Sequence, residues 1–279
     1  MVSLEPVVDE IGGRNSRMTM DTTSPPMGAD GAVSGKQTAP ATMRHEWRRY
    51  AGFLRRPVLP EEQVRTGGSG LAAIFRMLGL DLLLMAGLGV IAMLVIAAGV
   101  ELPETALAGM EIEIGLALAV VIVAPLVEEL LFRGWLSGKP GRVAALLAIL
   151  GGAALGGVLT ATGPQTDVPG PALFATGGGI VLAVILFVAL RNHDAPQWYR
   201  RAFPIFFWLS TLAFAFIHVF NFEGAEMLAA LPLVLPQFIT GSILGYMRVH
   251  YGLWSSIVLH MLHNGAALSL AYAATELAA

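Results

Sequence analysis

Apolar residues gather in blocks of about 20 between Ile74 and Ala274, with short polar turns between the blocks. A helix of about 20 apolar residues crosses the ~30 Å hydrocarbon core of a bilayer, because each residue adds ~1.5 Å. Helices are expected because the blocks lack strand-type alternation and because a helix pairs its backbone groups within itself. The sequence therefore predicts an all-α fold, a polytopic transmembrane helix bundle.

About seven such blocks can be counted. A range of six to eight spans stays open, because the Gly-rich third and fourth blocks could instead form one re-entrant pair. The blocks comprise residues 74–99, 114–135, 142–160, 172–190, 203–221, 227–247 and 252–274.

The composition supports a membrane protein, with the lipid bilayer as its partner, and excludes several other classes. Apolar residues make up 55% and charged residues 13% of the chain, whereas soluble domains carry about 25% charged residues. The net charge of −3 offers no basic field for a nucleic acid. The absence of cysteine rules out disulfides, thiolate metal sites and a cysteine nucleophile. The sequence has neither a glycine-rich phosphate loop for a nucleotide nor the Gly-Xaa-Ser-Xaa-Gly elbow of serine hydrolases.

Residues 1–68 differ from the rest and are predicted to form a cytoplasmic tail, disordered or interfacial, ahead of a transmembrane domain at 69–279. The stretch 24–42 is rich in Ser, Thr, Pro and Gly and has no apolar periodicity, so it cannot bury enough surface to fold alone. Basic and aromatic residues mix at 44–56, a pattern that suits a short helix on anionic lipid. A solvated linker is the alternative.

The distribution of Lys and Arg predicts the orientation, since cytoplasmic loops of membrane proteins carry an excess of both. With the N-terminus in the cytoplasm, the basic residues fall in or near the tail, the 133–142 turn, the 191–201 loop and the 248–250 turn. A high Arg, Ala and Gly content is typical of a GC-rich bacterial genome, so we expect a multi-pass protein of a bacterial inner membrane. The outer loops then hold only acids: Glu101, Glu104, Glu111, Glu113, Asp167, Glu223, Glu226 and Glu276.

Two adjacent carboxylates, Glu128 and Glu129, lie inside the second apolar block. A charge within a span costs at least ~2.5–3.5 kcal/mol on insertion scales, so such residues are rare and are usually functional. Arg133 follows Glu129 by one helical turn and can form an i,i+4 ion pair with it, whereas Glu128 points about 100° away and is free for other work. The structural alternative is an ion-pair lock between helices. For Asp81 in the first block, a snorkelling or inter-helix hydrogen-bonded acid is the favoured interpretation.

Polar residues also interrupt two later blocks. His218 ends the run Phe214-Ala215-Phe216-Ile217-His218, and the last block contains His260-Met261-Leu262-His263-Asn264. His260 and Asn264 share one helix face through their i,i+4 spacing. These side chains need polar partners inside a bundle, and Glu128, Glu129 and His218 are the main candidates.

This set of residues fits two kinds of hydrolase that need no covalent nucleophile. In one, a carboxylate and a histidine deprotonate a water, while a second histidine and an amide donate to the developing oxyanion. In the other, Glu128, His218 and His260 bind Zn²⁺ with a fourth position open for water. No motif in the chain separates the two, so no cofactor is assigned and a divalent metal stays an open alternative.

Residues 124–134, 214–218 and 260–264 resemble the three signature motifs of the CPBP family, the CAAX prenyl protease and bacteriocin-processing intramembrane proteases. The first motif is specific over eleven residues (Ala-Pro-Leu-Val-Glu-Glu-Leu-Leu-Phe-Arg-Gly), and the resemblance covers about 121–136 and 205–266. It implies the following roles: Glu128 as the general base, His218 as its assistant, His260 and Asn264 as the oxyanion hole, and Glu129, Arg133 and Phe214 as supporting residues.

The chain departs from the family pattern in one respect, because about 80 residues separate Arg133 from His218, more than in many members. The region 142–190 is therefore predicted to be an inserted helical pair. A second difficulty concerns depth: at ~1.5 Å per residue, Glu128 lies about 10 Å, His260 about 13 Å and His218 about 24 Å from the inner ends of their helices. We expect the fifth span to start later, to tilt, or to break near Pro204.

The sequence thus predicts an intramembrane endopeptidase that cleaves a hydrophobic or membrane-anchored peptide. A non-catalytic scaffold, maturation partner or immunity factor on the same fold is the alternative. A proton-coupled transporter is disfavoured, because it predicts an inverted repeat and the paired-glutamate block has no counterpart in the second half.

Overall fold

The computed structural model describes residue 40 and residues 42–64, 67–103, 112–163, 170–222 and 230–278. Residues 1–39 of the predicted tail lie outside this set. So do the following acids of the predicted outer loops: Glu104, Glu111, Asp167, Glu223 and Glu226.

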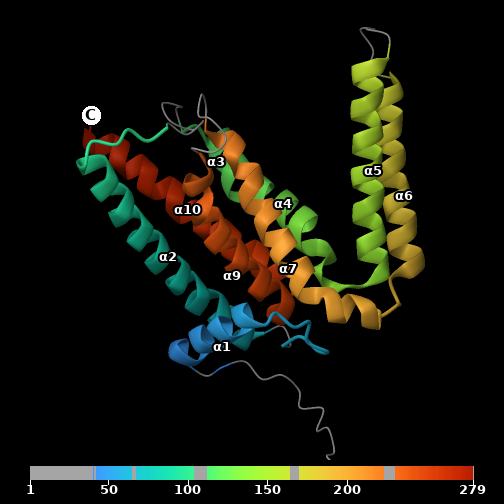
Figure 1. Cartoon of the computed structure of the whole chain (residues 1–279), viewed down its shortest axis with the longest axis horizontal. Helices are drawn as coiled ribbons and strands as arrows, with labels where there is room; N and C mark the ends of the chain where they lie inside the picture. Colours follow the sequence, from blue (N-terminus) through green and yellow to red (C-terminus); the bar gives the residue numbers. More distant parts are fainter. Residues whose placement is uncertain are drawn as a thin grey trace, which may run out of the picture. The chain divides into compact units, whose positions relative to one another are not determined.

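Every regular element of the described residues is helical (Figure 1), which confirms the all-α prediction. The longer helices are α1 (Met43–Arg55), α2 (Gly68–Ala97), α4 (Ala124–Arg133), α5 (Pro140–Thr162), α6 (Gly170–Leu190), α7 (Gln197–Ile217), α9 (Leu235–Tyr251) and α10 (Leu253–Ala278). Short helical segments join them: α3 (Ile114–Leu118), η1 (Ala119–Val123), η2 (Gly134–Ser137), η3 (His218–Asn221) and η4 (Leu231–Val234).

Within these described ranges, five helices are long and apolar enough to cross a membrane. Each of the seven apolar blocks contains a helix, but α9 has only 17 residues, and α10 loses hydropathy to His260, His263 and Asn264. The polar residues that suggest function therefore also weaken the apolar signal of the helix that carries them. The five candidate spans are Gly68–Ala97, Ile114–Ser137, Pro140–Thr162, Gly170–Leu190 and Gln197–Asn221.

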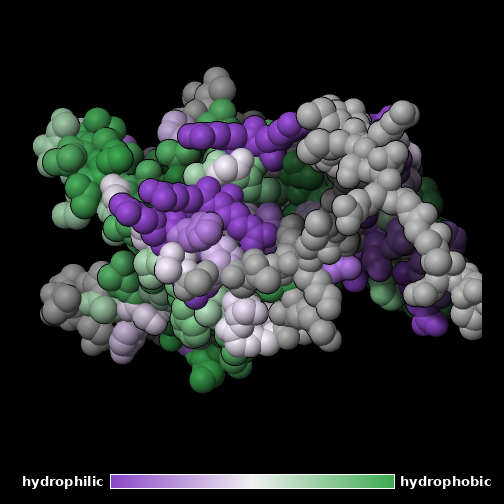
Figure 2. Space-filling view, turned by 90° about the horizontal axis from the view of Figure 1, so that it is seen from below, coloured by the Kyte–Doolittle hydropathy of each residue, from purple (hydrophilic) through white to green (hydrophobic). Residues whose placement is uncertain are grey.

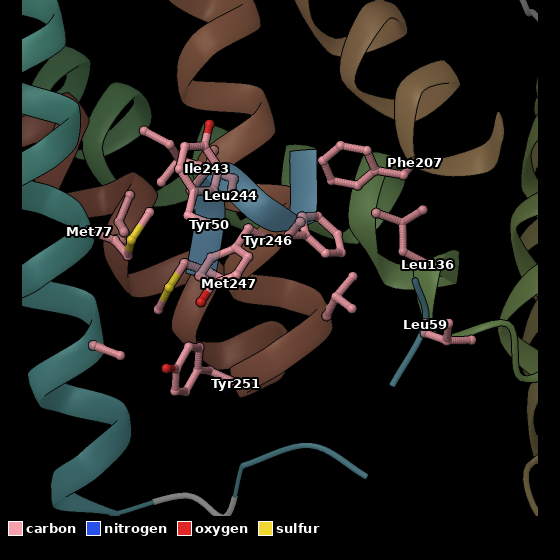
Figure 3. Close-up of a cluster of buried hydrophobic side chains, with 14 of the residues drawn as sticks. Tyr50, Leu59, Met77, Leu136, Phe207, Ile243, Leu244, Tyr246, Met247 and Tyr251 are labelled. Atoms are coloured by element: carbon pink, nitrogen blue, oxygen red, sulfur yellow. The ribbon is translucent and has the colours of Figure 1, made fainter. Parts of the chain in front are cut away.

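The buried core lies where α1, α2, α7 and α9 meet, and Figure 3 shows its side chains. Helix α1 contributes Tyr50 and Phe53 to this core, although the sequence suggests an interfacial helix or a linker there. Its Glu46 is fully buried and accepts hydrogen bonds from Tyr246 (2.6 Å) and Tyr251 (2.8 Å). The packed part of the chain therefore begins before Gly67.

Burial raises the pKa of Tyr50 to about 12, so this phenol stays neutral at physiological pH and acts as a hydrogen-bonding group. Its hydroxyl lies 2.5 Å from the hydroxyl of Ser242 on α9. This contact and the Glu46 hydrogen bonds are two polar links between α1 and α9.

Helices α5 and α6 pack against each other along their length (Figure 1). Glycines allow the close approach: a Cβ at Gly152 would lie 2.7 Å from the Cα of Gly179, and one at Gly156 would lie 3.0 Å from the carbonyl oxygen of Ala172. Small residues at such contacts let helix backbones touch in a membrane. Each helix is long enough to cross on its own, so a re-entrant pair is not required.

Helix α7 bends near its beginning (Figure 1). Pro204 lies inside this helix, and an internal proline bends a helix because it lacks an N–H and its ring crowds the preceding turn. The predicted fifth span begins at residue 203, so a bend at Pro204 leaves most of the distance of ~24 Å to His218 unchanged. Of the three features expected of this span, the bend corresponds to the break near Pro204.

Candidate active site

Glu129 and Arg133 form a buried ion pair along α4. Both side chains are fully buried, and an Arg133 Nη atom donates to the Glu129 carboxylate over 2.9 Å. The i,i+4 spacing in the sequence predicts this pair. The neighbouring Glu128 projects from a different face of α4, and 26% of its side chain is exposed.

His260 of α10 lies between the two carboxylates. Its Nδ1 is 3.1 Å from an oxygen of Glu129, and its Nε2 is 3.7 Å from an oxygen of Glu128. Its side chain is only 4% exposed. A row of polar side chains thus runs from Arg133 through Glu129 and His260 to Glu128. Glu128 is the most exposed of the four side chains.

The aromatic ring of Phe214 supports this row from α7. The guanidinium carbon of Arg133 lies 3.8 Å from the ring centroid, a cation–π contact. The ring of His260 meets the same phenyl ring edge to face at 5.7 Å. Phe214 is buried, so it holds both side chains in place and excludes water around them.

His218 lies one helical turn beyond Phe214, at the first residue of η3. Its Nδ1 is 2.7 Å from the carbonyl oxygen of Phe214, and the two rings are 4.8 Å apart. Among the residues that the structure describes, no hydrogen bond or ion pair joins His218 to Glu128 or His260. His218 and His260 thus contact the same phenyl ring, and Glu128 pairs with His260.

Asn264 donates a hydrogen bond of 2.9 Å to the carbonyl oxygen of Val120 in η1. This segment is π-helical, so each carbonyl oxygen accepts from the N–H five residues later. For Val120 that residue is Pro125, which has no N–H. The asparagine therefore satisfies a backbone acceptor that the proline leaves free, an interaction that a bilayer requires. One of its two amide hydrogens stays available.

Asp81 of α2 forms a second buried polar cluster beside the first. It accepts from the hydroxyl of Thr240 at 2.8 Å and lies 2.5 Å from Nδ1 of His263. The carboxylate is fully buried. Asp81 therefore links α2 to α9 and α10, and it fixes the rotation of the helix that presents His260.

Gly241 of α9 packs against the site residues Arg133 and Phe214. Its carbonyl oxygen accepts from an Nη atom of Arg133 at 3.3 Å. A Cβ here would lie 2.9 Å from the Phe214 ring and 3.1 Å from the same Nη atom. The stretch 241–254, which resembles the usual approach of the CPBP family to its last motif, begins at this glycine. That resemblance does not identify the contact.

Replacing Gly241 with alanine is expected to lower the free energy of unfolding by about 1–3 kcal/mol, because the added methyl group overpacks Phe214 and Arg133. Thermal unfolding of the purified protein in detergent measures this change. Gly89→Ala is the matched control, since a Cβ at this α2 position meets nothing within 4 Å. Equal stability of the two variants would show that the contact around Gly241 is loose.

The residues do not fit a metal site. Across the described ranges, no group of three or more His, Cys, Asp or Glu side chains is arranged to hold a metal ion. The candidate ligands Glu128, His218 and His260 do not lie together, because His260 approaches Glu128 while His218 contacts the carbonyl oxygen of Phe214. The described residues therefore offer no ligand set for the zinc alternative.

Comparison with known proteins places the chain in a family. The sequence model of the family described as "Type II CAAX prenyl endopeptidase Rce1-like" matches residues 111–266. No curated protein and no solved structure matches the chain. The matched range contains α4, α7, α9 and the part of α10 that carries the polar residues of the site.

Proposed function

The chain belongs to the Rce1-like family of type II CAAX prenyl endopeptidases, and from this premise we propose that it is an intramembrane endopeptidase. Its substrate is a hydrophobic or membrane-anchored peptide, and the reaction is hydrolysis of a peptide bond by an activated water. The observation that carries the proposal is the position of His260 between Glu128 and Glu129.

Glu128 is the general base. A water at ordinary hydrogen-bond distance, ~2.8 Å, can donate to the exposed side of Glu128, which leaves Nε2 of His260 for the oxyanion. Proton transfer by a positioned carboxylate contributes about 10²–10⁴-fold to a rate. The partial exposure of Glu128 leaves a side on which a scissile carbonyl carbon can approach this water.

His260 donates to the developing oxyanion. Its Nδ1 faces Glu129 and its Nε2 faces the reacting side, so donation from both nitrogens requires the imidazolium form. With that form, the charges of Glu128, Glu129, Arg133 and His260 sum to zero, as a buried cluster favours. The remaining amide hydrogen of Asn264 is the second donor, and such donors act strongly in a low-dielectric site.

His218 assists the transfer of the proton from the water. When the ring is neutral and Nδ1–H donates to the carbonyl oxygen of Phe214, the basic nitrogen is Nε2. Bound substrate would have to draw this nitrogen and Glu128 together, because no hydrogen bond joins them among the described residues. Catalytic hydrogen bonds often shorten only when substrate binds.

The topology that fits this function has seven spans and a cytoplasmic N-terminus. Hydrophilic residues gather on the face that carries α1 (Figure 2), and α1 itself contributes Arg44, Arg48, Arg49 and Arg55. This agrees with the tendency of basic residues to stay in the cytoplasm. With this topology, the site receives its substrates from the cytoplasmic half of a bacterial inner membrane.

The test is peptide cleavage in proteoliposomes. A farnesylated peptide ending in Cys-a-a-X and an unprenylated transmembrane peptide serve as probes, and mass spectrometry detects the products. We expect wild type to cleave at least one probe, and His260→Ala to reduce the rate about 10²–10³-fold, the usual cost of losing an oxyanion donor. Undiminished cleavage by His260→Ala would contradict the role of this histidine.

A further inference from the structure

A small cavity lies where α5 begins and α6 ends, apart from the catalytic residues. Its volume is about 190 Å³. The lining contains three cationic side chains and no carboxylate: Lys139, Arg142, Phe187, Arg191 and Asn192. Among the described residues, no hydrogen bond or ion pair involves the side-chain nitrogens of the three cations.

Close backbone contact brings these cations together. A Cβ at Gly141 would lie 3.0 Å from the carbonyl oxygen of Phe187 and 3.1 Å from the carbonyl carbon of Leu190. The start of α5 therefore touches the end of α6, and the side chains next to this contact, Arg142 and Arg191, face one cavity. The fold concentrates like charges that electrostatics alone would separate.

A fourth cation adds to this positive field. Arg248 of α9 is buried, and its pKa is lowered, mainly by burial and secondly by the positive charge of Arg142. Its hydrogen bonds go to the carbonyl oxygens of Arg133 and Gly134, at 2.9 and 3.3 Å. A bound anion in the cavity would relieve the repulsion among these groups.

The surface beside the cavity is apolar. Phe187 lines the cavity and is 43% exposed, and Val184 and Val188 on the same helix are 59% and 50% exposed. On α5, Leu147 is 63% exposed. A ligand with an anionic head and an apolar chain matches both parts of this surface.

We propose that the cavity lined by Lys139, Arg142 and Arg191 binds the phosphate of an anionic phospholipid, whose acyl chains lie along the exposed apolar side chains of α5 and α6. Basic pockets between membrane helices on the cytoplasmic side recognise anionic headgroups in this way. The lipid bridges the start of α5 and the end of α6. This site is independent of the proposed peptidase activity.

Lipid retention by the purified protein tests the proposal. Native mass spectrometry compares phosphatidylglycerol with phosphatidylcholine, added separately to protein in detergent. We expect preferential retention of phosphatidylglycerol, and we expect Arg142→Gln with Arg191→Gln to weaken this retention about 30-fold, as the loss of two basic residues near an anionic headgroup implies. The charge-conserving pair Arg142→Lys with Arg191→Lys should retain the lipid.

The matched control is Arg200→Gln with Arg201→Gln, which removes two charges from the start of α7, outside the cavity lining. An equal loss of lipid in this control, or equal retention of the two lipids by wild type, overturns the proposal. In a parallel arm, inorganic phosphate is added without lipid while thermal unfolding is followed. If phosphate alone raises the unfolding temperature of wild type but not of Arg142→Gln with Arg191→Gln, and phosphatidylglycerol is retained no better than phosphatidylcholine, the ligand is a free phosphate and the lipid assignment is wrong.

Discussion

Glu128→Gln is expected to reduce peptide-bond cleavage by about 10²–10⁴-fold, the contribution of a positioned general base. Glutamine has nearly the same shape as glutamate and can still contact Nε2 of His260, but it cannot accept the proton of the attacking water. Because 26% of the Glu128 side chain is exposed, the neutral amide should fold without a large cost. The rate measured in proteoliposomes at saturating peptide reports this loss.

Glu113→Gln is the matched control for this substitution. It removes an exposed carboxylate immediately before α3, in the same chain segment that leads into α4, and it should cleave at the wild-type rate. Cleavage by Glu128→Gln at the rate of this control would overturn the assignment of the general base.

Arg133→Met is expected to lower the free energy of unfolding by about 3–5 kcal/mol, because removing one member of a buried ion pair leaves an uncompensated charge. Glu129 is fully buried, and one of its oxygens has no hydrogen-bond partner among the described residues even with the arginine present. Methionine also loses the cation–π contact with Phe214. Unfolding by heat or by SDS titration in mixed micelles measures the change.

Two further variants separate this effect from a general loss of arginine. Arg133→Met combined with Glu129→Gln removes both charges, and we expect it to recover more than half of the lost stability because no buried ion is left unpaired. Arg201→Met removes an exposed arginine and should change the stability by no more than about 0.5 kcal/mol. If Arg133→Met were as stable as Arg201→Met, the buried pair would not hold α4 in place.

Contacts within one helix could be predicted from the sequence. The apolar blocks predict the positions of the helices, since the length of a span follows from the thickness of a bilayer. The Glu129–Arg133 pair follows from helical spacing alone. The same spacing separates Glu128 from this pair, and the structure places the two carboxylates on different sides of His260.

Contacts between helices could not be predicted in the same way. The partner of Asn264 is a backbone carbonyl that Pro125 leaves free, and the partner of Asp81 is His263 on another helix. Both depend on how α10 is rotated against its neighbours, which helical spacing does not determine. The sequence places these residues inside spans, and the fold decides what they bind.

The position of His218 depends on a local feature of α7 that the sequence does indicate. Counting residues along a straight helix separates His218 from Glu128, but α7 contains Pro204 and bends near its beginning (Figure 1). His218 contacts the ring of Phe214, four residues earlier in the same segment, and this ring also contacts His260.

The most direct measurement of the central claim is a comparison of the membrane peptides of cells that express wild type or Glu128→Gln at equal levels. The account predicts a set of cleaved membrane-protein or peptide termini that appears with wild type and is missing with Glu128→Gln, while uncleaved precursors accumulate with the variant. Identical peptide populations in the two strains, with both proteins folded in the membrane, would contradict a peptidase and favour a non-catalytic scaffold on the same fold.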